Sequence, residues 1–222
     1  MATLPGVSDV VKVAVLGVGG LGQHHVRIYA EMEQAGNVEF VGLYDPNLER
    51  AREIAEKNGV RALESMEAAL EQADGVSIVT PTVTHHELAS KFLKAGCHVL
   101  VEKPITDEAD QAAELVQLAQ ENDRVLQVGH VERFNPVFDY LQSVAKEPRF
   151  IETHRLSPYP ARSMDIGVVL DLMIHDLDIV LAFVDSSVKE VDGVGVPVLS
   201  ASEDIANAVS YTHLTLPTNR EV

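Results

Sequence analysis

A glycine-rich hexapeptide near the N-terminus has the spacing of a phosphate-binding turn. Residues 17–22 read Gly17-Val18-Gly19-Gly20-Leu21-Gly22, after an apolar run that predicts a buried strand and before a stretch with helical periodicity. Gly17 permits the tight turn, Gly19 lets the backbone approach a pyrophosphate, and Gly22 permits close packing of helix on strand. The amide groups at the helix N-terminus favour the negative charge of the phosphates.

A carboxylate stands where a dinucleotide-binding turn needs one. Asp45 ends a second predicted strand, 38–44, about 20 residues beyond the last glycine, where an acid accepts hydrogen bonds from ribose hydroxyls. This side chain would repel a 2′-phosphate, and no arginine follows it directly. The pattern therefore favours NAD over NADP. The alternative is a glycine-rich turn with an unrelated aspartate at a strand end.

Two polar tripeptides follow two further predicted strands, 75–79 and 98–101. They are Thr80-Pro81-Thr82 and Glu102-Lys103-Pro104. Because the carboxyl ends of parallel strands line the ligand crevice, we expect both tripeptides to face the nicotinamide, together with His85 in the next helix. Lys103 could donate a hydrogen bond to a reacting oxygen and stabilise negative charge on it. The alternatives are a surface lysine and a strand-end turn.

A second group of polar residues lies beyond residue 129. Asp171 and His175 are four apart in a predicted helix, 167–184, so they share a face, and the carboxylate could orient the imidazole as a general base. A purely structural pair is the alternative, and no third ligand with zinc spacing is found, so we predict no metal site. We expect Asp176 and Asp178 to be solvated or capping.

Arginines in the same region could hold an anionic substrate. Arg133 and Asn135 stand in the segment GHVERFNP (129–136), and Arg155 and Arg162 follow it. Guanidinium groups bind phosphate or carboxylate through paired hydrogen bonds. Because the chain is rich in acids, ordinary ion pairing is the alternative for each arginine.

The elements that must position these residues alternate between strand and helix up to residue 129. Predicted helices, 22–35, 47–58, 84–95 and 107–121, separate five short strands, with Thr84 and Glu87 in capping-box spacing. This alternation predicts an α/β fold with a doubly wound, mostly parallel sheet. After residue 129 we expect a helix at 135–145, a strand at 149–157 and another at 188–196, in a second domain of α+β type.

Composition narrows the classes of function. The formal net charge is −17, so the chain would repel nucleic acid and anionic membranes, and we expect neither as a partner. The hydrophobic fraction of 46% is enough for a packed core. One cysteine, Cys97, fits a reducing cytoplasm and is expected to be a small buried side chain. We find no signal peptide and no membrane helix in the sequence.

Taken together, these motifs resemble the Gfo/Idh/MocA family of nicotinamide-dependent oxidoreductases. The likeness covers residues 11–209 and rests on GVGGLGQHH (17–25), Asp45, TPTVTHH (80–86), VEKP (101–104) and DLMIHD (171–176). It implies a Rossmann domain at 1–129, a substrate domain with a largely antiparallel sheet from 130, and oxidation of a sugar or cyclitol hydroxyl. Lys103 matches the lysine of the family's EKP motif, and Asp171 and His175 match its active-site pair.

A finer resemblance concerns the substrate. The segments GHVERFNP, ETHR (152–155) and 168–184 are similar to bacterial UDP-N-acetylglucosamine 3-dehydrogenases, which implies oxidation at C3 of that nucleotide sugar for amino-sugar synthesis, and a homo-oligomeric whole protein. A free-sugar or myo-inositol dehydrogenase, or a non-catalytic NAD-binding regulator, remains as an alternative. Family members run past 300 residues, so we expect 130–209 to be a partial substrate domain and 210–222 to be a foreign tail.

Overall fold

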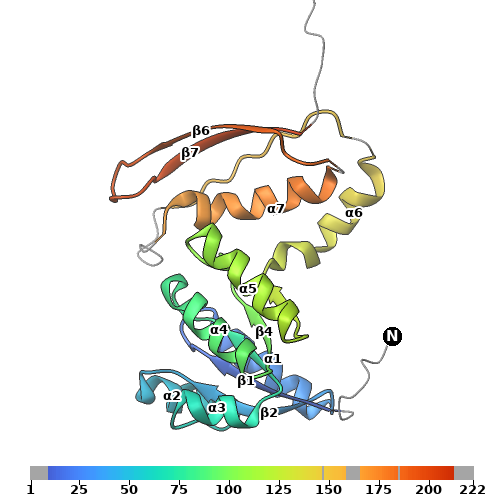
Figure 1. The fold of residues 1–222 in the computed structure, drawn as a ribbon. Coiled ribbons are helices and arrows are strands. Elements are labelled where there is room, and N and C mark those ends of the chain that lie inside the picture. The colour runs from blue at the N-terminus through green and yellow to red at the C-terminus, as the bar shows by residue number, and fades with distance from the viewer. Residues whose placement is uncertain (1–9, 147, 159–165, 185, 213–222) are drawn as a thin grey trace, which may run out of the picture. The chain divides into compact units, whose positions relative to one another are not determined.

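The chain divides into two compact units, which join in sequence between Gly129 and His130. The structure, a computed structural model, describes residues 10–146, 148–158, 166–184 and 186–212 (Figure 1). No helix among these residues is both long enough and apolar enough to cross a membrane.

The first unit is built on a parallel sheet of five strands. They are β1 (Val11–Leu16), β2 (Val38–Tyr44), β3 (Gly75–Ile78), β4 (His98–Val101) and β5 (Leu126–Val128), in the spatial order β2-β1-β3-β4-β5. Since β1 pairs with β2 on one side and with β3 on the other, the strand order reverses between β1 and β3. This topology confirms the predicted doubly wound α/β fold, and it places the ligand crevice at that reversal.

Helices cover both faces of this sheet. They are α1 (Gly22–Gln34), α2 (Leu48–Asn58), α3 (Met66–Gln72), α4 (His85–Lys94) and α5 (Ala109–Glu121). Successive residues of β1 enter different apolar clusters: Val13 and Val15 pack with α1 and α2, whereas Ala14 and Leu16 pack with α3, α4 and α5. The period of two in a strand therefore produces a core on each face of the sheet. Helix α3 was not predicted.

The second unit contains less buried structure. It has α6 (Pro136–Val144), a five-residue π-helical turn at Val169–Met173, α7 (Ile174–Phe183) and the antiparallel strands β6 (Glu190–Val196) and β7 (Ile205–Tyr211). Phe138 on α6 packs edge-to-face on Phe183 of α7, with ring centroids 5.4 Å apart. Every residue of β6 is exposed. The hairpin agrees with the expected antiparallel sheet.

Two expectations for this region are corrected, and one observation concerns the predicted tail. The segment 148–158 is irregular, so the predicted strand at 149–157 is wrong. The predicted single helix at 167–184 begins with the π-helical turn. Strand β7 includes Ser210 and Tyr211, which pair with Val191 and Glu190, so the sheet continues two residues into the predicted foreign tail. Residues 213–222 lie outside the described residues.

Candidate functional site

The glycine-rich loop joins β1 to α1 at the point where the strand order reverses. Gly17 has a φ of +85°, and a Cβ there would overlap the carbonyl oxygen of Val79 at the end of β3. A Cβ on Gly22 would overlap the carbonyl oxygen of Gly17. A Cβ on Gly19 would meet nothing within 4 Å, and Gly19 and Gly20 are exposed. The loop is therefore closely packed at both ends and open to an approaching ligand in the middle.

The first turn of α1 adds a favourable end for an anion. Leu21 precedes the helix and is 49% exposed, and no side chain makes a capping hydrogen bond at this fully described terminus. The first turn also carries no acidic residue. Because uncapped amide groups and the helix dipole both favour negative charge, a pyrophosphate would fit this end.

Asp45 is fixed beside the glycine loop. Its Oδ2 accepts a hydrogen bond from the Val18 amide at 2.9 Å, and its Oδ1 accepts one from the Asn47 amide, also at 2.9 Å. Carboxylate oxygens can accept more than one hydrogen bond, so the half-buried side chain keeps acceptor capacity for ribose hydroxyls. The loop and the carboxylate together fit the adenosine half of NAD.

The segment after β3 lies against the same loop. The methyl group of Thr80 lies within 3 Å of where a Gly17 Cβ would stand, which places Thr80 beside the glycine turn. Pro81 is exposed and Thr82 is buried. The predicted capping box is wrong: Thr84 makes no side-chain cap, and its hydroxyl instead forms hydrogen bonds with the Pro81 carbonyl and Thr80 Oγ1, each at 2.7 Å. Thr84 therefore stabilises the turn before α4 and does not cap the helix.

His85 lies inside the first unit instead of facing an open crevice. It is 1% exposed. Its Nδ1 lies 2.9 Å from the Pro104 carbonyl oxygen, and its Nε2 lies 2.9 Å from the Thr80 carbonyl oxygen. Each ring nitrogen therefore faces a backbone carbonyl oxygen of one of the two strand-end tripeptides.

The Glu102-Lys103-Pro104 segment follows β4 at the carboxyl edge. Glu102 Oε2 accepts a hydrogen bond from the Lys103 amide at 3.3 Å, and its Oε1 lies 3.2 Å from His25 Nε2. A Cβ on Gly129 would overlap the Glu102 carboxylate, so the glycine provides the space for this side chain. Lys103 is half-buried, and the peptide bond that follows it is cis.

His25 is the residue of this site that the sequence analysis missed. It lies on α1, three residues past the last glycine, and its Nδ1 lies 2.8 Å from Ser77 Oγ on β3. The signal was present: His25 is part of the GVGGLGQHH motif, but spacing alone does not separate it from its exposed neighbour His24.

The predicted catalytic pair lies in the second unit. Asp171 is in the π-helical turn and His175 is in the first turn of α7. The Asp171 amide donates to the Gly167 carbonyl at 3.0 Å. π-Helical turns inside helices occur often at functional sites, which agrees with a role for this segment. Lys103, the third residue with a predicted catalytic role, lies in the first unit.

The predicted substrate arginines are paired with acids of α7. Arg133 donates to Asp178 through Nε at 2.6 Å and Nη2 at 2.8 Å, and Arg155 contacts Asp176 through Nη2 at 3.0 Å. These hydrogen bonds are the main reason that the pKa of each guanidinium is raised. The expectation that both aspartates are solvated or capping is therefore wrong.

The other residues predicted in this region have simpler positions. Asn135 caps α6, since its side chain accepts a hydrogen bond from the Val137 amide at 3.0 Å. Arg162 lies outside the described residues. Among the residues that the structure describes, no three His, Cys, Asp or Glu side chains converge as a metal site would require.

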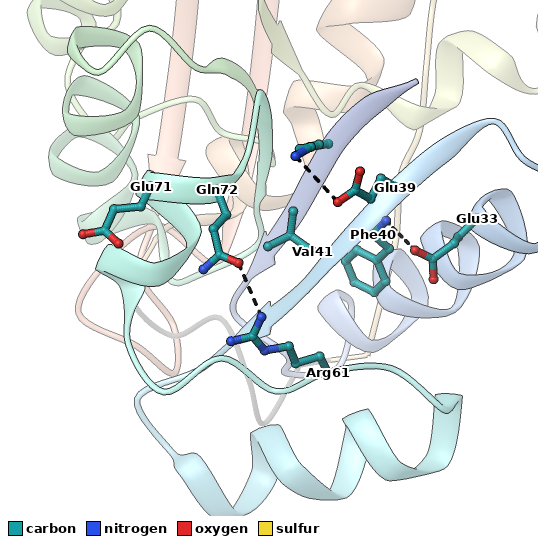
Figure 2. Close-up of a pocket in the computed structure, with 8 residues that line it drawn as sticks. Glu33, Glu39, Phe40, Val41, Arg61, Glu71 and Gln72 are labelled. Carbon is teal, nitrogen blue, oxygen red and sulfur yellow. Dashed lines mark hydrogen bonds and ion pairs between the residues drawn. The ribbon is translucent and has the colours of Figure 1, made fainter. Parts of the chain in front are cut away.

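A separate cavity of about 410 Å³ lies at the amino ends of β1 and β2, away from the glycine loop (Figure 2). Its polar groups largely satisfy one another. Lys12 pairs with Glu39 at 3.8 Å, Glu33 accepts from the Phe40 amide at 2.8 Å, and Arg61 donates to Gln72 at 3.4 Å. Because the cavity lies at the amino ends of the strands and the glycine loop follows the carboxyl end of β1, the cavity is distinct from the dinucleotide site.

Comparison with known proteins agrees with this geometry. Residues 11–130 match the model of the Gfo/Idh/MocA family, described as an oxidoreductase family with an NAD-binding Rossmann fold. The chain is 41% identical over 198 residues to a UDP-N-acetylglucosamine 3-dehydrogenase from Acidithiobacillus ferrooxidans, which covers 89% of this chain and 62% of that protein. A crystal form of that enzyme superposes with a TM-score of 0.83 at 40% identity, over 91% of this chain and 66% of that chain.

A more distant relative is the scyllo-inositol 2-dehydrogenase (NAD(+)) of Bacillus subtilis, at 28% identity over 90% of this chain and 63% of that protein. The chain thus spans slightly less than two thirds of the length of these relatives. The family match covers more than half of the chain and includes the whole sheet of the first unit. This chain therefore belongs to the Gfo/Idh/MocA family of oxidoreductases with an NAD-binding Rossmann fold.

Proposed function

We propose that this chain provides the NAD site and part of the substrate site of an enzyme that oxidises a sugar hydroxyl, namely C3 of UDP-N-acetylglucosamine. One observation carries the proposal: the glycine loop, Asp45 and the Glu102-Lys103-Pro104 segment all follow strands of one parallel sheet and lie at its carboxyl edge. The 41% identity to a UDP-N-acetylglucosamine 3-dehydrogenase supports the choice of sugar.

The cofactor would be held by residues of the first unit. Gly17, Gly19, Gly20, Leu21 and Gly22 would bind the pyrophosphate, and Asp45 would bind the adenosine ribose and exclude a 2′-phosphate. Thr80, Pro81, Thr82 and Glu102 would line the nicotinamide end, with His85 behind them. Bound NAD supplies the acceptor for the hydride that leaves the sugar carbon.

The proton chemistry would fall to three side chains. His175 would accept the proton of the sugar hydroxyl, and Asp171 would orient the imidazole. Lys103 would donate a hydrogen bond to the same oxygen and stabilise the negative charge that develops on it. The position of Lys103 directly after β4, and of His175 beside a π-helical turn, supports these roles.

The nucleotide diphosphate of the substrate needs local positive charge, because the chain as a whole carries −17. Arg133, Asn135, Arg155 and Arg162 would provide that local site. The bonds of Arg133 to Asp178 use Nε and Nη2, and a guanidinium has five N–H donors, so one edge can still serve a phosphate oxygen. The aspartates would hold the two guanidinium groups in a fixed orientation.

Residues 1–129 would form the NAD-binding domain, and 130–209 would form part of a substrate domain. The whole protein would work as a homo-oligomer. It would work in the cytoplasm, and the single buried cysteine supports that compartment.

Inositol oxidation is the second candidate, since the scyllo-inositol relative matches over 90% of this chain. A panel of substrates separates the two. NAD reduction at 340 nm is followed with UDP-N-acetylglucosamine, UDP-glucose, myo-inositol and scyllo-inositol. The assay uses this chain and a chimera in which the residues after Tyr211 are those of the Acidithiobacillus relative. We expect turnover of UDP-N-acetylglucosamine alone. Turnover of an inositol with none of UDP-N-acetylglucosamine would contradict the proposed substrate.

A further inference from the structure

Two pairs of histidines that are adjacent in sequence lie in the first unit, and in each pair one side chain is more buried than the other. His24 and His25 lie on α1, and His85 and His86 lie on α4. The outer members are an exposed His24 and a half-buried His86 that pairs with Glu114 at 3.0 Å. The inner members both contact the segment that carries Lys103. Each inner residue therefore has a sequence neighbour that serves as its matched control.

His25 reaches this segment through the Glu102 carboxylate. The side chains of His25 and Glu102 are only 16% and 14% exposed, and Ser77 on the other side of the ring is buried. A carboxylate only accepts, so His25 Nε2 must be the donor to Glu102. In the neutral ring, Nδ1 is then an acceptor, and the Ser77 hydroxyl donates to it over 2.8 Å. This assignment fixes the tautomer of His25.

Ser77 and Glu102 complete a short chain of hydrogen bonds through His25. The Ser77 hydroxyl contacts His25 Nδ1, and His25 Nε2 contacts Glu102 Oε1. The other oxygen of the Glu102 carboxylate accepts a hydrogen bond from the Lys103 amide.

His85 holds the other end of the same segment. Its ring lies between the carbonyl oxygens of Pro104 and Thr80, each 2.9 Å from one ring nitrogen, and so lies against both the segment after β4 and the segment after β3. Val99 and Val101 of β4 face the apolar cluster of α3, α4 and α5, so by alternation the side chain of Glu102, directly after β4, leaves on the α1 face. His85 belongs to α4, whose apolar residues pack on the opposite face. Lys103 is thus held from both faces.

We propose that His25 and His85 are positioning residues for Lys103, which they hold through Glu102 on one side and through the Pro104 carbonyl on the other. This inference rests on the proposed function, in which Lys103 acts on the substrate oxygen. A misplacement of about 1 Å at a catalytic group can cost on the order of 100-fold in rate, so both clamps are expected to matter for turnover more than for cofactor binding.

The test compares His25→Leu and His85→Leu with the control variants His24→Leu and His86→Leu in the full chain. Hydrogen exchange of the amides of residues 101–106 is measured by mass spectrometry without ligand. It should be at least about 10-fold faster in the two inner variants and unchanged in the controls. The affinity for NAD, from calorimetry, should change by less than about 3-fold, whereas kcat should fall by about 10- to 100-fold.

Conservative variants separate positioning from general stability. Glutamine offers two N–H donors and one acceptor, so His25→Gln and His85→Gln should recover part of the slow exchange and part of kcat. Gly129→Ala approaches Glu102 from another side, since its Cβ would displace the carboxylate from His25. It should reproduce the effects of His25→Leu without changing any histidine.

Lys103→Ala, measured in parallel, keeps this inference separate from the proposed function. Full turnover in Lys103→Ala would overturn the role of Lys103 itself. Exchange at 101–106 that is equal in inner and control variants would overturn the positioning role, whatever the turnover. A loss of NAD affinity equal to the loss of kcat, with no recovery in the glutamine variants, would also overturn it.

Discussion

The two units differ in how they hold their polar groups. In the first unit, His25, His85 and Glu102 are enclosed by a sheet that has an apolar cluster on each face. In the second, Arg133 and Arg155 pair with aspartates near the surface, and Phe138 is the one buried hydrophobic side chain among its described residues. The polar contacts of the first unit therefore lie beside a packed core, whereas those of the second unit lie closer to solvent.

This difference indicates where substitutions will be felt. Packed interiors transmit a change of one side chain to their neighbours, because there is little space in which to relax. Exposed ion pairs contribute about 0–1 kcal/mol each and are screened by salt. We therefore expect the first unit to determine stability and cofactor binding, and the second to be more tolerant of substitution and more sensitive to ionic strength.

The largest effect is expected when one catalytic residue from each unit is removed. Lys103→Ala and His175→Ala should each lower kcat by roughly 10²- to 10⁴-fold, the range for a general acid or base, while NAD still binds. Since both would act on one oxygen, the double variant should lose less than the product of the two single losses. Full activity in His175→Ala would remove the second unit from the chemistry.

A smaller effect contrasts the two cores. Phe92 on α4 is 0% exposed, so Phe92→Ala should lower the free energy of unfolding of the first unit by about 3–5 kcal/mol. Val194 on β6 is 61% exposed, and Val194→Ala should change the stability by less than about 0.5 kcal/mol. Both changes in the free energy of unfolding are measured by urea titration, with limited proteolysis at each urea concentration to show which unit has unfolded. Equal losses would show that β6 is as well packed as α4.

The ion pair between Arg133 and Asp178 provides a third test. A double-mutant cycle with Arg133→Ala and Asp178→Ala should give a coupling energy of about 0.5–1 kcal/mol, because Arg133 is partly exposed. The coupling should shrink in 1 M salt, where the Debye length is about 3 Å. A coupling that salt leaves unchanged would mean that the pair is shielded from solvent.

The smallest effect concerns the turn between β6 and β7. Asp204 Oδ2 accepts hydrogen bonds from the amides of Val198, Leu199 and Ser200, which hold the pKa of this carboxyl well below its usual range. A depressed pKa contributes stability above the unfolded value of about 3.9 and loses it as the pH falls further. Asp204→Asn should therefore differ from the unsubstituted chain at pH 6 and approach it near pH 2, by hydrogen exchange of 198–204. A constant difference would contradict this account.

The sequence predicted the first unit well because its local signals agree with one another. The strands predicted at 38–44, 75–79 and 98–101 each begin and end within one residue of their predictions, and the helix predicted at 47–58 is α2, with Asn47 as its N-cap. Cys97 is buried, as predicted, and burial raises the pKa of its thiol. Helix α3 was missed because it is only seven residues long, which leaves little periodicity to detect.

The remaining differences arise from contacts that helix and strand periodicity does not specify. Thr84 has capping-box spacing but turns its hydroxyl to Thr80 and Pro81. The partners of His25 and His85 lie on β3 and in the segments after β3 and β4, so no helical pattern distinguishes the two residues from their neighbours His24 and His86. Alternation at 149–157 suggested a strand, yet a strand also requires a partner, and none pairs with it among the described residues. Register and pairing are properties of the fold that periodicity does not specify.

A calorimetric titration of this chain with NAD and with NADP, repeated for Asp45→Ser, tests whether the glycine loop and Asp45 form an NAD site. We expect one NAD site per chain, tighter binding of NAD than of NADP, and a smaller difference between the two affinities in the variant, because Asp45 is fixed 2.9 Å from the Val18 amide beside the glycine loop. Absence of NAD binding, or tighter binding of NADP by the unsubstituted chain, would contradict this expectation.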